Sequence, residues 1–406
     1  MASSKRNRQE NVVGINARDV RSINRSVILN LIRERQPIPR VGIARLSKLN
    51  KSTVSSIVAS LLREELIVEE EAKSAAVGRN PTNLRLRTGK YLVGALSFDP
   101  WASTAAIVDV DGTIRHATEI SASETSPEQF VAHCLEELNA LRKQCSLGRF
   151  GGIGITVAGV VDPVHSMVVF APNLGWKNVD LGKLVHKICP DVSSITIEND
   201  AKAAALAELW FGYHNINVSN FVFLSVGRGI GTGIVIDGHL LEGKSNLAGE
   251  FGHMTLVAGG EPCSCGNRGC WEAYASDYAT VSRYLKAKGT KPGLGVRLRL
   301  ENVISSAAAG DSVARDELRR TGHALGLGIA NIIKAVDPDA IVIGGEITSV
   351  WELVAPQIME GVKERGFFGT LGQTKILPTS LPGKSALLGA ATLSISNFFS
   401  TSRVAV

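Results

Sequence analysis

The sequence predicts an α/β protein in which a small N-terminal winged helix-turn-helix domain precedes a body of two similar α/β lobes. The chain has 406 residues, which is enough for two or three domains. Its net charge is +6, yet residues 1–88 alone carry +9, so the remainder is mildly acidic. From residue 90 onward, short apolar strands alternate with amphipathic helices, which is typical of α/β folds. A hydrophobic content of 44% and 41 glycines indicate a globular, loop-rich chain.

The N-terminal domain is predicted over residues 18–88, after a polar, basic tail at residues 1–17. Apolar residues recur at helical spacing up to Arg35, a second short helix follows Pro39, and Ser52 is expected to cap a third helix. The side chains expected to point inward are Ile23, Val27, Ile28, Leu31 and Ile32 in the first helix, Val41, Ala44, Leu46 and Leu49 in the second, and Val54, Ile57, Val58, Leu61 and Leu62 in the third.

Two strands, near residues 66–68 and 84–86, complete this domain, and the turn at residues 77–81 between them forms a wing. The start of the third helix in such domains enters the major groove of DNA. The expected DNA contacts are Lys51, Ser52, Thr53, Ser55, Ser56 and the wing residue Arg79. An ordinary small helical domain with solvated charges would show the same periodicity, but the local positive charge together with the wing favours DNA binding.

The body is predicted to comprise a first lobe at residues 89–200 and a second at residues 201–383, with a C-terminal helix at 384–406 completing the first lobe. The expected strands lie at 91–98, 104–110, 153–157, 195–200, 221–226, 234–236 and 340–345, and the expected helices at 130–141, 201–209 and 387–399. Asn199 and Asp200 stand where a strand meets a helix. They are interpreted either as helix caps or as polar groups in a ligand cleft at the strand end.

One histidine and three cysteines gather between residues 253 and 270. Cys263, Cys265 and Cys270 form a C-x-C-x4-C pattern, with His253 ten residues upstream. Thiolate and imidazole are the ligands that Zn²⁺ prefers, and four protein ligands make a structural site without an open position. Reduced, buried cysteines beside an incidental histidine are the alternative, which the close spacing disfavours.

The segments Gly249–His253 and Cys263–Glu272 resemble the signature of the ROK family of repressors, open reading frames and kinases. The resemblance extends from about residue 20 to residue 393. It implies an actin-like, two-lobed body shared by sugar kinases and sugar-responsive repressors, of which only the repressors carry the N-terminal winged helix-turn-helix. It further implies zinc bound by His253, Cys263, Cys265 and Cys270, and a sugar cleft lined by Asn173, Asn199, Asp200, Glu250, His253 and Glu272.

The chain departs from the kinases of that family where ATP phosphates would bind. The kinases have an Asp-x-Gly-Gly-Thr-like turn, whereas this sequence has Leu96-Ser97-Phe98-Asp99-Pro100. Bulky side chains prevent close approach of a phosphate to the backbone, and proline supplies no N–H. A second glycine-rich stretch keeps its glycines at residues 227–233, but Arg228 replaces the usual threonine. The sequence therefore predicts a sugar site that is retained beside a phosphate site that is lost, and hence no enzymatic activity.

The expected function is that of a sugar-responsive, DNA-binding transcriptional repressor of carbohydrate metabolism genes, with xylose or glucose as candidate effectors. Its expected partners are operator DNA, a monosaccharide and a second copy of itself, as a homodimer or a dimer of dimers. The alternatives are a sugar kinase with an appended DNA-binding domain and a repressor controlled by a protein partner. The sequence has no apolar run of bilayer length and no signal peptide, so a cytoplasmic location is expected.

Overall fold

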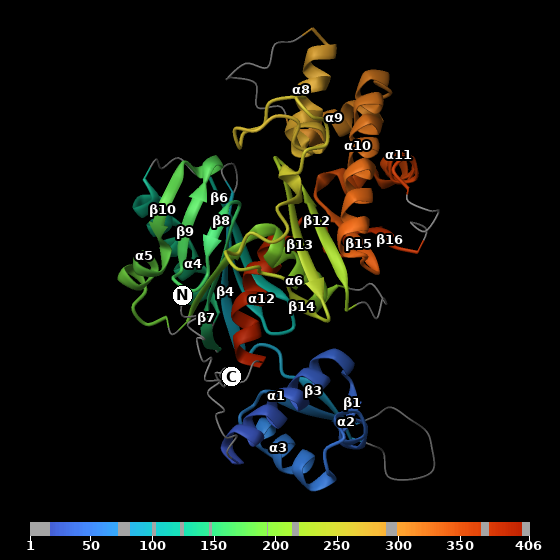
Figure 1. The fold of residues 1–406 in the computed structure, drawn as a ribbon. Coiled ribbons are helices and arrows are strands. Elements are labelled where there is room, and N and C mark those ends of the chain that lie inside the picture. The colour runs from blue at the N-terminus through green and yellow to red at the C-terminus, as the bar shows by residue number, and fades with distance from the viewer. Residues whose placement is uncertain are drawn as a thin grey trace, which may run out of the picture.

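The computed structural model describes residues 17–71, 82–99, 103–121, 126–145, 148–192, 194–212, 219–289, 299–366 and 373–399. A small N-terminal domain, drawn in blue, lies below a body of two lobes (Figure 1). Residues 1–16 of the predicted tail and the wing residue Arg79 lie outside the described residues.

The N-terminal domain contains three helices followed by a β-hairpin, in the predicted order. Its small antiparallel sheet has the strand order β1-β3-β2. Ile28, Leu29, Ile32 and Ile43 form the centre of its core and have no solvent-exposed surface. The elements are α1 (Ala17–Arg35), β1 (Ile38–Pro39), α2 (Arg40–Ser47), α3 (Lys51–Arg63), β2 (Ile67–Glu71) and β3 (Thr82–Leu86).

The expected cap of α3 was wrong. Asn50, not Ser52, caps the helix, because the Asn50 Oδ1 accepts a hydrogen bond of 2.7 Å from the backbone N–H of Thr53. Ser52 lies within the first turn, and its hydroxyl donates to the same Asn50 Oδ1 at 2.8 Å. Asparagine reaches the third amide of the helix from one residue before it, which is the usual capping geometry.

Several inward-facing assignments in α1 and α2 were also wrong. Val41 and Leu46 are 67% and 47% exposed, and Ile43 fills the core position of α2 in their place. In α1, Ile23 and Val27 are 37% and 40% exposed. The apolar stripe of α1 is wider than the surface that α2 and α3 can cover, so its outer edge remains in solvent. In α3, the buried side chains include the predicted Val54, Ile57, Val58 and Leu61.

The first lobe has a five-stranded mixed sheet with the order β11-β7-β4-β5-β6. The β11–β7 and β7–β4 pairs are parallel, and the hairpin strands β5 and β6 are antiparallel. A second, three-stranded sheet of order β10-β9-β8 was not expected from the sequence. The elements are β4 (Tyr91–Phe98), β5 (Ser103–Asp109), β6 (Ile114–Ile120), α4 (Pro127–Gln144), β7 (Arg149–Val157), β8 (Val160–Asp162), β9 (Met167–Ala171), η1 (Pro172–Leu174), β10 (Trp176–Asp180), α5 (Leu181–Ile188) and β11 (Ile195–Asn199).

The second lobe repeats this theme with a five-stranded sheet of order β14-β13-β12-β15-β16, covered on one side by long helices. Its strands are β12 (Phe221–Val226), β13 (Ile230–Ile236), β14 (His239–Leu240), β15 (Ala340–Gly344) and β16 (Lys375–Pro378). Its helices are η2 (Phe251–His253), α7 (Glu272–Ala275), α8 (Asp277–Ala287), α9 (Leu300–Ala308), α10 (Ser312–Val336), η3 (Glu346–Val350) and α11 (Trp351–Glu364).

Two helices, α6 (Asp200–Phe211) and α12 (Ser385–Phe399), lie between the large sheets of the two lobes (Figure 1). The helix α12 packs against β7 and β4, while α6 packs against β13 and α12. The described helices include none that is both long and apolar enough to span a bilayer. The domain boundaries drawn from the sequence stay a prediction.

Glycines make the close approach of α6 to β13 possible. A Cβ on Gly231 would lie 2.7 Å from the Ala201 Cβ, and one on Gly233 would lie 2.5 Å from the Ala205 Cβ. The strand was expected to begin at residue 234, but β13 begins at Ile230 and includes both glycines. These two glycines therefore belong to a packed strand and not to the loop that was expected.

We predict that Gly233→Ala destabilises the protein by about 1–3 kcal/mol, because the added methyl group overpacks the contact between β13 and α6. Urea unfolding of purified protein measures this change. Gly227→Ala is the matched control, since a Cβ there would meet no atom within 4 Å. Equal unfolding free energies for the two variants would contradict the packing role of Gly233.

Candidate functional site

A cavity of about 1350 Å³ lies between the lobes and is lined by residues of both. All six residues predicted to contact a sugar line this one cavity, although they are spread over 100 positions of sequence. They come from η1 (Asn173), the end of β11 (Asn199), the start of α6 (Asp200), the segment before η2 (Glu250), η2 itself (His253) and the start of α7 (Glu272).

Asn199 serves as cap and as cavity residue at once. Its Oδ1 accepts hydrogen bonds from the backbone N–H groups of Ala201 and Lys202, at 3.0 and 3.1 Å, and so caps α6. Its Nδ2 donates to the carbonyl of Gly159 at 3.0 Å, which joins β11 to the loop after β7. Both interpretations of Asn199 therefore apply, because the cap fixes the side chain at the cavity wall.

Asp200 follows this cap and directs a carboxylate into an enclosed, acidic environment. Burial raises the pKa of Asp200 to about 6, and the neighbouring carboxylates of Asp99 and Glu250 raise it as well. The backbone N–H of Ala201 opposes this shift by hydrogen bonding. A carboxylate that is held ionised at such a cost is a strong acceptor for a ligand hydroxyl.

The segment that carries Glu250 and His253 is held against β13. The Thr232 hydroxyl donates to the carbonyl of Gly249, whose φ of +92° favours glycine. A Cβ on Gly252 would lie 2.1 Å from the Ile230 carbonyl oxygen, so this glycine allows the segment to touch the strand. The two cavity residues are thereby fixed at the edge of the second-lobe sheet.

Glu272 connects this sheet to the cysteine loop. Its Oε2 accepts from the backbone N–H of Ile230 at 3.1 Å, and its Oε1 accepts from Ser264 Oγ at 3.3 Å and Cys263 Sγ at 3.5 Å. Gly229 allows this approach, because a Cβ there would lie 2.2 Å from Glu272 Oε2. The carboxylate thus faces the cavity from a fixed position.

The four predicted metal ligands meet at one point beside this carboxylate. One ligand atom from each of His253, Cys263, Cys265 and Cys270 lies within 4.8 Å of all the others. The His253 Nδ1 is 3.7 Å from Cys263 Sγ, and Cys265 Sγ is 3.7 Å from Cys270 Sγ. Burial raises the pKa of Cys270 to about 12, so a bound cation would be needed to hold this thiol as thiolate. The cluster could hold a metal ion.

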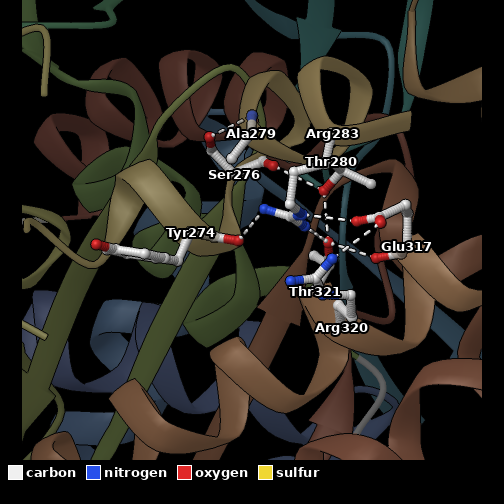
Figure 2. Close-up of polar contacts among 8 residues, drawn as sticks. All are labelled: Tyr274, Ser276, Ala279, Thr280, Arg283, Glu317, Arg320 and Thr321. Atoms are coloured by element: carbon white, nitrogen blue, oxygen red, sulfur yellow. Dashed lines mark hydrogen bonds and ion pairs between the residues drawn. The ribbon is translucent and has the colours of Figure 1, made fainter. Parts of the chain in front are cut away.

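A buried polar network connects α7 to α8 and α10 (Figure 2). Arg283 of α8 donates to Glu317 Oε2 at 2.7 Å, to Thr321 Oγ1 at 2.7 Å and to the Tyr274 carbonyl at 2.8 Å. The Tyr274 hydroxyl accepts from the backbone N–H of Glu261 in the cysteine loop at 2.8 Å. The network therefore joins α8 and α10 to both α7, which carries Glu272, and the cysteine loop.

Two backbone amides in the stretches where the kinases of the family would bind phosphate, those of Asp99 and Gly227, are used internally. The Asp99 N–H donates to Ser103 Oγ at 3.0 Å, and the same hydroxyl donates back to the Asp99 carbonyl. Phe98 is buried in edge-to-face contact with Phe130 and Trp176. Pro100 lies outside the described residues. In the second stretch, the Gly227 N–H donates to the Gly229 carbonyl at 3.0 Å.

Sequence reasoning missed several members of the cavity wall. Phe170 of β9 and Leu247 of the β14–η2 loop line the cavity and are about half exposed, at 49% and 48%. Asp99 also lines it. No motif marks Phe170 or Leu247, because an exposed apolar residue at a cavity mouth has no spacing pattern. Asp99 was noted only as part of an altered turn.

Taken together, the fold and cavity define a two-lobed protein that can enclose a small, polar, hydroxyl-rich ligand beside a metal-binding loop. Residues 102–397 match the ROK family, and the chain belongs to this family. It is 32% identical to the xylose repressor of Bacillus spizizenii over 382 residues, which are 93% of this chain and 96% of that relative.

Two crystal structures show the same fold. A ROK family transcriptional regulator described as a homolog of the Escherichia coli MLC protein has a TM-score of 0.79 and 28% identity, covering 94% of this chain and 97% of that one. A ROK family glucokinase from Streptomyces griseus in complex with glucose and AMPPNP has a TM-score of 0.66 and 29% identity, covering 74% of this chain and 98% of the kinase. The predicted fold class, an N-terminal DNA-binding-type domain on an actin-like body, is confirmed.

We predict that Asp200→Asn stabilises the ligand-free protein by about 1–3 kcal/mol at pH 7.5, because the folded chain disfavours the Asp200 charge. The pKa of Asp200 rises from 3.8 to about 6 on folding, so folding disfavours this charge fully above pH 6 and not at all below pH 3.8. Urea unfolding at pH 7.5 and pH 4 measures the difference between variant and parent. The gain should shrink at the lower pH, and a pH-independent gain would contradict the assignment.

Proposed function

We propose that this protein is a sugar-responsive, DNA-binding transcriptional repressor of carbohydrate metabolism genes. One observation carries the proposal. The same chain contains a cavity lined by carboxylates, amides and an imidazole, and a small N-terminal domain of three helices and a β-hairpin. The relative named as a xylose repressor matches 93% of the chain, whereas the glucokinase structure matches 74%. Most of the N-terminal domain must therefore lie in the part that the repressor shares.

A monosaccharide suits the cavity chemically. Its hydroxyls donate and accept hydrogen bonds, and the carboxylates of Asp200, Glu250 and Glu272 can each accept from hydroxyl donors. A wrong epimer would leave buried polar groups unpaired at a cost of about 1–3 kcal/mol each, which provides selectivity. With Nδ1 of His253 facing the thiols, Nε2 is the ring nitrogen left for the cavity side.

The body favours binding over phosphoryl transfer. The amides of Asp99 and Gly227 already have intramolecular acceptors, and Gly231 and Gly233 are packed under α6. Two acidic residues lie near the ends of β12 and β15: the backbone N–H of Asp277, the first residue of α8, donates to the Gly227 carbonyl at 2.8 Å, and Glu346 begins η3 shortly after β15. Burial raises the pKa of each to about 7, the nearby Glu346 carboxylate raises that of Asp277 further, and neither residue lines the cavity. We therefore propose that Asp200 accepts a sugar hydroxyl as a ligand contact.

DNA binding is assigned to the N-terminal domain. Lys51, Ser52, Ser55 and Ser56 are exposed at the start of α3, and Thr53 is half-buried there. This placement matches a helix that inserts into the major groove, while Arg79 keeps its proposed role in the wing as an expectation from sequence. A homodimer on a palindromic operator follows from the two-fold symmetry of such sites.

The N-terminal domain touches the body at the ends of the two central helices. The Arg33 guanidinium of α1 lies 4.1 Å from the centre of the Trp210 ring at the end of α6. The Asn30 Nδ2 donates to the Phe399 carbonyl at the end of α12 at 3.4 Å, and Ser26 Oγ donates to the same oxygen. Since α6 begins at Asp200, one rigid helix runs from the cavity to this contact. We propose that sugar binding in the cavity alters the affinity of the protein for operator DNA through this helix and its contact with the N-terminal domain.

Zinc is the metal proposed for the cysteine loop. Tetrahedral zinc with bonds of about 2.3 Å to sulfur and 2.0–2.1 Å to nitrogen places two ligands about 3.5–3.8 Å apart. The two separations of 3.7 Å fit this arrangement. When bound, zinc would hold the loop in shape and supply no reaction chemistry, because four protein ligands leave no open position. The loop in turn positions Glu272 through the Ser264 hydroxyl, since a zinc-bound Cys263 thiolate would have no proton to donate.

We predict that Cys265→Ala lowers the zinc content from about one ion per chain to below about 0.1 and weakens sugar binding at least about tenfold. Elemental analysis and calorimetry measure the two quantities. Cys145→Ala, at a half-buried thiol outside the loop, is the control and should change neither. Full sugar affinity in metal-free protein would show that the loop does not position the cavity.

We predict that D-xylose or D-glucose weakens binding to operator DNA by about 5–150-fold, the usual range of coupling between two sites. These sugars are chosen because one is in the name of a relative and the other is bound in a related structure. Fluorescence anisotropy with duplex DNA selected by the protein from a random pool measures the effect. A coupled assay for ADP with ATP and the bound sugar tests the kinase alternative, and ADP formation would support it.

The same anisotropy measurement tests whether α6 transmits the effect of sugar binding to the N-terminal domain. In Arg33→Ala, sugar affinity should persist while the effect of sugar on DNA affinity falls. Arg142→Ala is the matched control, because Arg142 lies 4.3 Å from the centre of the Phe150 ring in the first lobe, away from the N-terminal domain. DNA affinity that stays unchanged by a sugar shown to bind in calorimetry would refute the proposed function.

A further inference from the structure

Asn246 joins three segments of the cavity wall from a loop between β14 and η2. Its φ of +54° is in the left-handed region, which asparagine tolerates better than most residues. Its Nδ2 donates to the Val161 carbonyl at 3.1 Å and to Glu198 Oε1 at 3.0 Å. Its own carbonyl and Oδ1 accept from Lys202 Nζ at 2.6 and 2.8 Å. Every polar atom of this side chain is therefore used.

The two charged partners are buried on either side of this asparagine. Lys202 and Glu198 are only 2% and 4% exposed. Burial lowers the pKa of Lys202 and raises the pKa of Glu198, so each charge depends on polar contacts for its stability. Glu198 Oε1 also accepts from the Asn199 backbone N–H at 2.8 Å. Asn246 is a neutral group that satisfies both charges at once.

Val161, Glu198 and Asn246 are each next in sequence to a residue that lines the cavity. Val161 of β8 follows Val160, Glu198 of β11 precedes Asn199 and Asp200, and Asn246 precedes Leu247 and the segment to Glu250. β8 and β11 belong to the first lobe, whereas the β14–η2 loop belongs to the second. The contacts of Asn246 therefore hold wall segments of the two lobes together, although Asn246 does not itself line the cavity.

We propose that Asn246 is a positioning residue that sets the affinity of the cavity for its sugar. The proposal rests on the proposed sugar-binding function. Without the Asn246 side chain, Leu247 and Glu250 lose their tie to β8 and β11, and the two halves of the wall can separate. Sugar must then bring them together, which weakens binding. The zinc loop and the N-terminal domain do not depend on this contact, so metal content and sugar-free DNA binding should persist.

Asn246→Gly is the variant of choice. Glycine adopts the left-handed backbone without strain, and the Asn246 backbone carbonyl can still accept from Lys202. The matched control is Asn178→Gly, because Asn178 has a φ of +52° and is exposed on β10, outside the cavity. Calorimetry with D-xylose and D-glucose should give at least about tenfold weaker binding for Asn246→Gly and unchanged binding for the control.

Three further measurements separate positioning from general destabilisation. Zinc content, sugar-free DNA affinity and the thermal midpoint should stay near those of Asn178→Gly. Lys202→Met should also weaken sugar binding, and the double variant should be less impaired than the product of the two single effects, because both remove one connected network.

The outcomes distinguish this proposal from the one on which it rests. Sugar affinity that is unchanged in Asn246→Gly, in a protein whose parent binds the sugar, overturns the positioning role alone. A loss of zinc, DNA affinity and sugar affinity together also overturns it, because the residue would then act on folding. A parent protein that binds neither sugar overturns both proposals.

Discussion

The close approach of backbones around α6 is the constraint on which the rest of the structure depends. Small residues permit it on two sides, since Gly231 and Gly233 of β13 meet Ala201 and Ala205, and Gly389 of α12 meets Ala203. With α6 so confined, its first residue is held at the cavity and its last turn at the N-terminal domain. A helix about 18 Å long, at 1.5 Å per residue over its 12 residues, thereby spans the distance between the cavity and the N-terminal domain.

The residues that line the cavity are held in place by successive layers of contacts. Asp200, Glu250 and Glu272 stand at its wall beside the helix cap Asn199 and part of the cysteine loop, and a buried lysine–asparagine–glutamate cluster lies behind this wall. The Arg283 network then joins the cysteine loop to the long helices of the second lobe. Such layered support is expected where ligand selectivity depends on hydrogen bonds whose geometry must be fixed before the ligand arrives.

Much of this arrangement could be predicted from sequence, and the limits have physical causes. Strands that are apolar on both faces, such as β4 and β12, were placed at their observed bounds. The cysteine loop came from a specific motif, and the six cavity residues came from the family resemblance to which that motif pointed. Residues that act through tertiary contacts were not found. Asn246 carries no motif, and Arg33 is one of many arginines in a basic segment.

The glycines of β13 were assigned to a loop, because a glycine that allows helix packing and a glycine that surrounds a phosphate have the same sequence signature. Likewise, Val41 and Leu46 have helical spacing, but only packing decides which edge of an apolar stripe is covered.

The internal use of backbone amides at the ends of β4 and β12 has an evolutionary consequence. If the body binds no nucleotide, as proposed, a single substitution would not give it a phosphate site, because the Asp99 amide is tied to Ser103 and the Gly227 amide closes a turn on Gly229. Both turns would have to be rebuilt, and each change alone would bring no advantage. The ligand site, by contrast, can change its preference one wall residue at a time. On the proposed function, a lineage with this body would change its ligand preference more readily than it would acquire phosphoryl transfer.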